Sequence, residues 1–357
     1  MLYGVIMAGG SGTRFWPESR KKRPKQLLRI VGDKTMIRAT VERVLPEISF
    51  DRIMVVTGEA HADEIKQELP ELGAGMVVAE PRGRNTAPCI ALAAYKIAKQ
   101  DSNAVLVVLP ADHLIGNDMA FLNVLRAAYQ VAADTEYLIT FGIVPSRPET
   151  GYGYIELGKA ISSVGSERLF RVKSFIEKPD LATATRFLAE GNYLWNSGMF
   201  VWKASTIIKS FEEHLPSISR SMERILPDLN TAREPGAIRK IYKKMESISI
   251  DYGIMEKAKN TVVIRADITW NDVGSWSSLA DVWDTDQHKN ATRGKVLCVE
   301  SKECVASSPH KVAILLGIED LVIVDTPDAL LVCRKTCSQD VKSLQELLVG
   351  LGYHDLL

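Results

Sequence analysis

The sequence has no long hydrophobic run and no excess of charge of either sign. None of its apolar runs approaches the roughly 18 to 20 residues that a bilayer-spanning helix needs. The 44 basic and 44 acidic residues give a formal net charge of zero, so no overall field attracts nucleic acid or an anionic membrane. We therefore expect neither nucleic acid nor a membrane as a partner, and any preference for anions has to be local.

Cysteine is scarce, and its spacing excludes the usual paired-thiol sites. The five cysteines are odd in number, and no two of them form a C-x-x-C pair. Reduced, mostly buried thiols are expected. The first residues, "LYGVIMAGG", run directly into a polar loop without the charged segment and cleavage site of a secretory signal, so a cytoplasmic location is expected.

Short apolar runs alternate with amphipathic segments over the first 140 residues. The runs "YGVIMA", "RIMVVTG", "AVLVVLPAD" and "EYLITFGI" are rich in Val, Ile and Leu, as are parallel strands buried on both faces. Helical patterns lie near residues 36–46, 60–69, 86–99 and 118–133. The alternation predicts an α/β fold, in which ligands bind beyond the carboxyl ends of the strands.

The pattern changes twice further along the chain. From about residue 140, strand-like segments such as "GYGYIEL" and "SGMFVWK" mix with helices near 180–190 and 204–214. Beyond about residue 286, brief strands with tight turns precede an amphipathic helix in "SQDVKSLQELLVGLG". We predict a catalytic domain over residues 1–285 and a short C-terminal β region with a closing helix over 286–357.

A glycine-rich loop follows the first predicted strand. Gly9, Gly10 and Gly12 allow backbone N–H groups to approach an anion closely, although such a turn is often purely structural. No Gly-Lys-Ser/Thr follows, as a P-loop would require. The spacing is not G-x-G-x-x-G either, which argues against a dinucleotide-dependent oxidoreductase despite Glu59 after the second strand.

Six basic side chains lie between Arg14 and Lys25. Arg14 follows the glycines closely, where its planar fork suits phosphate oxygens. Lys25 follows a proline that fixes the local backbone. We interpret Lys21, Lys22 and Arg23 as solvated loop charges, because no aromatic residues or wider basic stripe accompany them.

Carboxylates follow two other strand-like runs. Asp112 ends the run in "LPADH", where a helix N-cap is the alternative reading, and Asp272 lies in "WNDVGSW". Two carboxylates with phosphate oxygens and water suit Mg²⁺. His113 is interpreted as structural, because a lone histidine that follows an aspartate is more often structural than catalytic.

The segment "EPRGRNTAPCIALAA" predicts a helix that begins near Asn85 or Thr86, one of which is expected to cap it. Glu80 stands just before it. A carboxylate can accept hydrogen bonds from both N1–H and the N2 amine of guanine, so Glu80 is our candidate guanine reader; an ordinary surface glutamate is the alternative. Further along, Gly151 and Gly153 allow backbone to approach a flat ligand, with a strand-entry turn as the alternative.

The loop "AGGSGTRFWPESRKKRPKQ" resembles the signature loop of the sugar-nucleotide pyrophosphorylases, and its Phe-Trp-Pro and Pro-Lys-Gln details resemble the mannose-1-phosphate guanylyltransferase family. The resemblance covers about residues 1–285 and extends into the tail. It implies a Rossmann-like mixed sheet of the nucleotide-diphospho-sugar transferase type with a small, partly β-helix-like C-terminal region.

The resemblance also implies roles for individual residues. Arg14 and Lys25 are the expected catalytic residues, and Asp112 and Asp272 the expected Mg²⁺ ligands. The expected nucleotide-binding residues are Ala8, Gly9, Gly10, Gly12, Thr13, Glu80, Arg84, Asn85, Thr86 and Asp112. The expected sugar-phosphate-binding residues are Gly151, Tyr152, Gly153, Glu177, Lys178 and Asn196.

The implied reaction joins GTP and mannose 1-phosphate to give GDP-mannose and pyrophosphate with the help of Mg²⁺. Two alternatives stay open: a guanylyltransferase for another manno-configured sugar phosphate, such as a heptose 1-phosphate, and a catalytically silent subunit that senses sugar nucleotides. Longer relatives append an isomerase domain, and we expect no phosphomannose isomerase activity here. The tail is expected either to pair two subunits as a homodimer or to close over the site.

Overall fold

The computed structural model describes all residues, 1–357, and they form two compact units. The first unit comprises residues 1–9, 40–111 and 115–270, and the second comprises residues 10–39, 112–114 and 271–357. Neither unit is one continuous stretch of chain, so contacts rather than chain order define them. The division at residue 286 stays a prediction.

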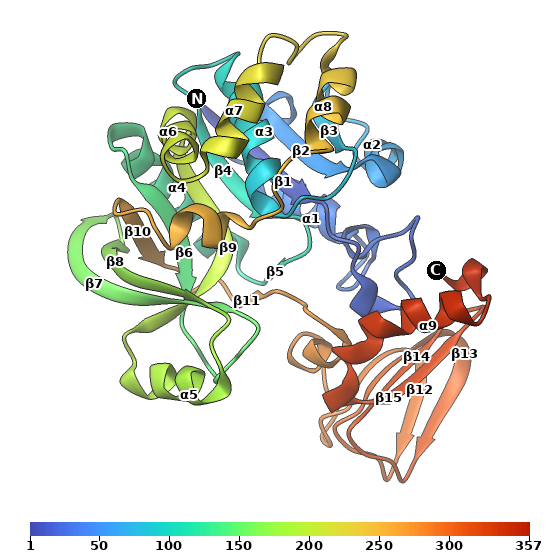
Figure 1. Cartoon of the computed structure of the whole chain (residues 1–357). Helices are drawn as coiled ribbons and strands as arrows, with labels where there is room; N and C mark the ends of the chain where they lie inside the picture. Colours follow the sequence, from blue (N-terminus) through green and yellow to red (C-terminus); the bar gives the residue numbers. More distant parts are fainter. The chain divides into compact units, whose positions relative to one another are not determined.

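The first unit is built on a nine-stranded mixed sheet (Figure 1). In spatial order the strands are β3 (Val77–Glu80), β2 (Ile53–Gly58), β1 (Leu2–Ala8), β4 (Val105–Pro110), β9 (Tyr193–Lys203), β6 (Leu138–Ile143), β10 (Thr261–Arg265), β8 (Glu167–Glu177) and β7 (Gly153–Val164). The strands β1 to β4 run parallel, and β9 runs antiparallel to β4 and β6. The predicted α/β class and mixed sheet are confirmed.

The central strands form where the sequence has continuous apolar runs. Nearly every residue of β1, β2, β4 and β6 is buried, because helices cover the sheet and leave neither face to water. The helices of this unit are α2 (Ala62–Glu68), α3 (Thr86–Ala98), α4 (Asp118–Asp134), α5 (Leu181–Glu190), α6 (Ala204–His214), α7 (Pro216–Ile225) and α8 (Glu234–Tyr242). The helices α7 and α8 were not predicted from the sequence.

The second unit combines the N-terminal loop region with the C-terminal sheet. Its strands are β12 (Ala291–Val299), β13 (Val305–Leu316), β14 (Leu321–Asp325) and β15 (Leu330–Arg334), in that spatial order. The first three run parallel, and β15 is antiparallel to β14. The closing helix α9 covers Leu344–Gly350 and is shorter than predicted, because residues 340–343 form a 3₁₀ turn ahead of it.

Tryptophans in the core of the second unit anchor the N-terminal loop. Trp276 is fully buried, and its ring centroid lies 5.1 Å from that of Phe15. Its Nε1 donates to the Trp16 carbonyl at 3.0 Å, and Trp283 Nε1 donates to the Ile30 carbonyl at 2.8 Å. Trp276 is fully buried and Trp283 partly buried, and both satisfy their N–H groups. The loop is therefore held by the C-terminal part of the chain.

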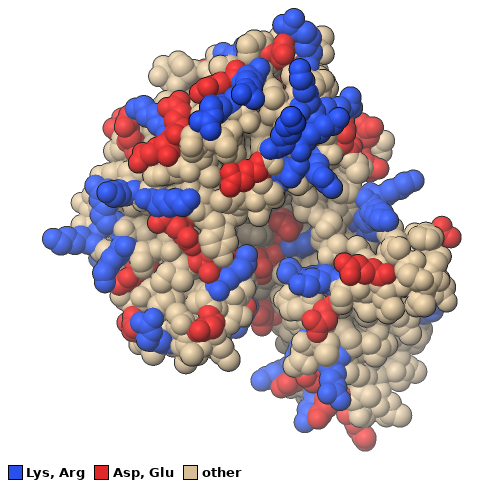
Figure 2. Space-filling view, viewed as in Figure 1, with Lys and Arg blue, Asp and Glu red and all other residues tan.

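Three short elements include residues of both units: α1 (Met36–Val44), β5 (Leu114–Ile115) and β11 (Trp270–Asn271). No helix in the chain combines the length and the apolar character needed to cross a membrane. On the face shown in Figure 2, basic and acidic side chains are interspersed, with a group of basic ones over α8, whose last turn carries Arg239 and Lys240.

Candidate functional site

The predicted site residues are divided between the two units. The second unit holds Gly10, Gly12, Thr13, Arg14, Lys25, Asp112 and Asp272, and the first unit holds Ala8, Gly9, Glu80, Arg84, Asn85, Thr86 and all the residues predicted to bind the sugar phosphate.

In the second unit, the glycine loop and Lys25 line one cavity of about 330 Å³. Arg14, Asp112 and Asp272 line it too, although the last two are 160 residues apart in sequence. Arg14 is exposed, whereas Lys25 is only 5% exposed. The structure therefore brings these predicted residues together around one small cavity.

The Lys25 ammonium is held by two partners at the cavity. Its Nζ lies 2.9 Å from Asp112 Oδ2 and donates to the Asp272 carbonyl oxygen at 2.8 Å. Burial acts to raise the pKa of Asp112, but the charges of Lys25 and His113 outweigh it and hold that pKa below its usual range. Asp112 is thus a carboxylate at neutral pH. The N-cap of α4 is Asn117, so Asp112 does not cap that helix.

The backbone around Asp272 is strained. Val273 has a φ of 49°, which is unusual for a β-branched residue, and its N–H donates to Asn271 Oδ1 at 2.7 Å. No pattern in the sequence indicated this conformation. It fixes the turn that presents both the Asp272 carbonyl and its carboxylate at the cavity.

Two hard-oxygen carboxylates at the cavity beside the glycine loop fit Mg²⁺, which takes few protein ligands and completes its shell with substrate oxygens and water. No group of three or more His, Cys, Asp or Glu side chains forms a metal cage in the chain. The donor set therefore suits an ion bound jointly with phosphates.

Glu80 is the main feature of the predicted nucleotide-binding residues in the first unit. It ends β3, is 3% exposed, and its Oε1 has no hydrogen-bond partner. Burial raises its pKa to about 7, against a smaller opposing effect of hydrogen bonding with Tyr242. An added Cβ at Gly9 would lie 3.6 Å from Glu80 Oε2, so the loop backbone lies close by. The alternative of an ordinary surface glutamate does not hold.

The loop after Glu80 is fixed by side chains that contact backbone. Asn85 caps α3 with a positive φ of 66°, and its Oδ1 accepts from Thr86 N at 2.9 Å. Thr86 Oγ1 accepts from Ile250 N at 2.9 Å. Arg84 donates to the carbonyl oxygens of Tyr242 and Lys243 at 3.2 and 2.8 Å. Arg84 therefore binds the backbone at the C-terminal end of α8.

The predicted sugar-side residues gather at the ends of β7, β8 and β9. An added Cβ at Gly153 would collide with Glu177 Oε2, so a larger residue there would displace the Glu177 carboxylate. That oxygen is buried and has no hydrogen-bond partner, while Oε1 pairs with Lys178 Nζ at 3.1 Å. Lys178 has a φ of 49°. This left-handed backbone conformation brings the side chains of the adjacent residues Glu177 and Lys178 together at the end of β8.

Asp251 is a half-buried acid beside this group that the sequence analysis missed. Asn196 Nδ2 donates to its Oδ1 at 2.9 Å. Burial, and then the neighbouring charge of Glu177, raise the pKa of Asp251 to about 7. Asp251 begins a single π-helical turn, Asp251–Met255, a feature often found at functional sites. It lies in no recognisable motif, so only the fold could reveal it.

Aromatic rings form one wall beside the sugar-side residues. The Tyr152 ring lies 5.2 Å from Trp195 and 5.1 Å from Trp270, edge-on to both. The Arg147 guanidinium lies 5.6 Å from the Trp195 ring. Asn196 Oδ1 also accepts from Thr140 Oγ1 at 3.1 Å, which orients its amide. The group combines a rigid apolar wall with oriented polar groups, as small-molecule sites do.

Comparison with known proteins identifies the family to which this chain is similar. A family model described as nucleotidyl transferase matches residues 3–289, and one described as a MannoseP isomerase/GMP-like beta-helix domain matches residues 294–348. The mannose-1-phosphate guanylyltransferase of Klebsiella pneumoniae is 39% identical over 351 residues, spanning 98% of this chain and 74% of that protein. That of Salmonella montevideo is 40% identical over 362 residues, spanning 99% and 75%.

A solved structure agrees over nearly the whole chain. The crystal structure described as a mannose-1-phosphate geranyltransferase from Thermus thermophilus superposes with a TM-score of 0.87 at 33% identity. The match covers 97% of this chain and 99% of that one.

The backbone at Gly12 generates a stability prediction. Gly12 has a φ of 62°, and an added Cβ would collide with the Lys25 side chain and lie 2.8 Å from its backbone N. Gly12→Ala should lower the free energy of unfolding by about 1–3 kcal/mol, measured by urea denaturation. Gly10→Ala is the control, because a Cβ there meets nothing within 4 Å. Equal stability of the two variants would contradict the prediction.

The raised pKa of Glu80 predicts a pH dependence of stability. Between the ordinary pKa of 4.5 and about 7, the folded chain binds more protons than the unfolded chain, so this residue's contribution to the unfolding free energy falls as pH rises through that window. Glu80→Gln should remove this fall. It should therefore stabilise the protein at pH 8 by up to roughly 3 kcal/mol relative to its effect at pH 4.

Urea denaturation at both pH values measures the Glu80 effect, with Glu59→Gln as the matched control. Glu59 is exposed and pairs with Arg239 at the surface, so its replacement should leave the pH dependence unchanged. The same pH dependence in wild type and Glu80→Gln would refute the raised pKa.

Proposed function

The chain belongs to the mannose-1-phosphate guanylyltransferase family of nucleotidyltransferases, and from that membership we propose that it transfers GMP from GTP to mannose 1-phosphate. The products are GDP-mannose and pyrophosphate. The observation that carries the proposal is the buried Lys25 ammonium beside the glycine loop, Arg14 and two carboxylates. Such an arrangement suits a reaction in which several phosphates meet.

In the proposed step, an oxygen of the sugar phosphate attacks the α-phosphorus of GTP in line. A new P–O bond forms there, the bond to the bridging oxygen of the β-phosphate breaks, and pyrophosphate leaves with the electron pair. No proton transfer is required, because the nucleophile is already an anion. Positioning and charge stabilisation then supply most of the catalysis.

The second unit, together with Gly9 of the first, is proposed to bind the phosphates of GTP. Lys25 offsets the charge that develops at the α-phosphate, and its ion pair with Asp112 keeps the ammonium in place. Arg14 and the loop amides of Gly9–Thr13 hold the leaving pyrophosphate. Asp112 and Asp272 would hold Mg²⁺, which when bound neutralises phosphate charge.

The first unit is proposed to select the substrates. Glu80, left with an unpartnered Oε1, accepts from N1–H and N2 of guanine as a carboxylate. Arg84, Asn85 and Thr86 support the nucleotide-binding loop next to it. On the sugar side, Glu177 and Asn196 bind hydroxyls, Lys178 binds the phosphate, and the stretch 151–153 presents backbone and the Tyr152 ring.

Pyrophosphate release tests this function directly. It is measured with GTP, Mg²⁺ and mannose 1-phosphate, beside ATP, UTP and glucose 1-phosphate. Release strongest with GTP and mannose 1-phosphate is the expected result. Release with GTP and only a different sugar phosphate, such as a heptose 1-phosphate, would correct the substrate, and no release from folded protein with any pair would favour a silent sensing subunit.

Lys25→Ala should lower kcat by a hundredfold or more, by analogy with the loss of other transition-state donors. The control is Lys22→Ala, which removes the same charge from an exposed position nearby. Steady-state rates of pyrophosphate release measure both variants. An undiminished rate in Lys25→Ala would remove this residue from its proposed role.

Asp272→Asn should raise the Mg²⁺ concentration needed for half-maximal rate, because an amide is a weaker ligand than a carboxylate for a hard cation. The measurement is a Mg²⁺ titration of the rate at saturating substrates. Asp267→Asn serves as the control, since Asp267 is exposed and does not line the cavity. Superimposable titrations of wild type and Asp272→Asn would argue against this metal ligand.

A further inference from the structure

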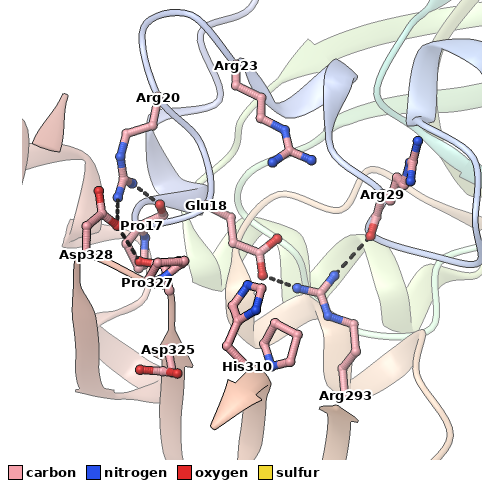
Figure 3. A pocket seen from close by; sticks show the side chains of 12 residues that line it. Pro17, Glu18, Arg20, Arg23, Arg29, Arg293, His310, Asp325, Pro327 and Asp328 are labelled. Carbon is pink, nitrogen blue, oxygen red and sulfur yellow. Dashed lines mark hydrogen bonds and ion pairs between the residues drawn. The ribbon is translucent and has the colours of Figure 1, made fainter.

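The second unit has a larger cavity that none of the residues discussed for the reaction lines. Its volume is about 730 Å³, against about 330 Å³ for the cavity at the glycine loop. Four arginines line it: Arg20, Arg23, Arg29 and Arg293 (Figure 3). Its volume lies within the range of small-molecule binding sites.

The carboxylates at this cavity are already paired within the chain. Glu18 forms an ion pair with Arg293, and Asp328 pairs with Arg20 at 3.0 Å. The third, Asp325, pairs with Lys311 at 2.9 Å. None of these three carboxylates is therefore paired with Arg23 or Arg29, the other two arginines at the cavity.

Arg23 and Arg29 are the remaining cations. Their guanidinium groups form no hydrogen bond or ion pair within the chain. In Figure 3, the Arg23 side chain points from the loop toward Glu18 and Arg293, and the Arg293 guanidinium reaches the backbone carbonyl of Arg29. Both side chains are exposed, as the sequence analysis expected for Arg23, and neither guanidinium has a counter-ion within the chain.

The framework around these two arginines is rigid. Arg20 and Arg23 exchange backbone hydrogen bonds of 3.0 and 2.9 Å, which close a tight turn. Arg293 donates to Ser307 Oγ at 2.8 Å and to the Arg29 carbonyl at 2.9 Å, and it lies 5.2 Å from the Trp283 ring. Backbone on either side of the cavity is therefore fixed before any ligand arrives, which lowers the entropic cost of binding.

We infer that this cavity binds a small phosphorylated molecule at a site separate from the glycine-loop cavity, with Arg23 and Arg29 as its anion ligands. Guanidinium groups bind phosphate oxygens through paired N–H donors. Two unpaired guanidinium charges match the charge of nearly −2 on a phosphate monoester at neutral pH, whereas a monocarboxylate would neutralise only one of them. Pro17, Pro309 and Pro327 supply an apolar wall for the rest of the ligand.

Counting bound pyrophosphate tests the site. Equilibrium dialysis with radiolabelled pyrophosphate is carried out on the wild-type protein and on the double variant Arg23→Gln/Arg29→Gln. The double variant should bind one pyrophosphate fewer per chain. The matched control, Lys21→Gln/Lys22→Gln, removes the same charge from the same loop but not from the cavity lining, and it should bind as many as wild type.

Equal binding by the wild type and the arginine variant overturns the inference, as does an equal loss in the lysine control, which would indicate general electrostatic attraction. Competition then separates the sources of the phosphate group. Displacement of the arginine-dependent label by mannose 1-phosphate identifies a sugar phosphate, and displacement by GMP identifies a nucleotide. If neither mannose 1-phosphate nor GMP displaces the label, or if sulfate displaces it equally well, the assignment to a phosphorylated molecule is overturned.

This test does not depend on the proposed reaction. Neither arginine has a role in the proposed catalysis, so the arginine variant should release pyrophosphate from GTP and mannose 1-phosphate at the wild-type rate. A chain without that activity would contradict the proposed function and leave the pyrophosphate count unaffected.

Discussion

The arrangement of the second unit depends on the pairing of one buried cation, the Lys25 ammonium. An ammonium group removed from water costs several kcal/mol unless it is paired. Lys25 meets this requirement with a carboxylate 87 residues away and a carbonyl 247 residues away in sequence. Three separate stretches of chain must therefore be in place before Lys25 is satisfied. The absence of a side chain at Gly12 and the strained turn at Val273 both follow from this arrangement.

The first unit has the opposite electrostatic character. Glu80 and Glu177 each keep a buried carboxylate oxygen without a hydrogen-bond partner, and burial raises the pKa of Glu80 and of Asp251 to about 7. Buried polar atoms without partners are uncommon in native proteins and usually have a functional reason. Hydrogen-bond donors of a bound ligand would complete these two oxygens.

Positive charge is local in this protein, and the structure divides it between two cavities. The chain as a whole is neutral, yet the six basic residues between Arg14 and Lys25 all lie in the second unit. Arg14 and Lys25 belong to the glycine-loop cavity, whereas Arg20 and Arg23 line the larger cavity. One short loop lines both cavities because Pro24 and the turn between Arg20 and Arg23 direct neighbouring side chains to different places.

The amino-acid sequence by itself determined the α/β class, most helices and the glycine loop, because apolar periodicity and glycine content act locally. It also indicated Lys25, Asp112 and Asp272 through their motifs. Only the tertiary structure decided which partners satisfy Lys25, that Glu80 is buried, that Asp251 joins Glu177, and that Arg23 faces a cavity. Burial and pairing depend on residues from distant parts of the chain, and no local pattern encodes the distance between them.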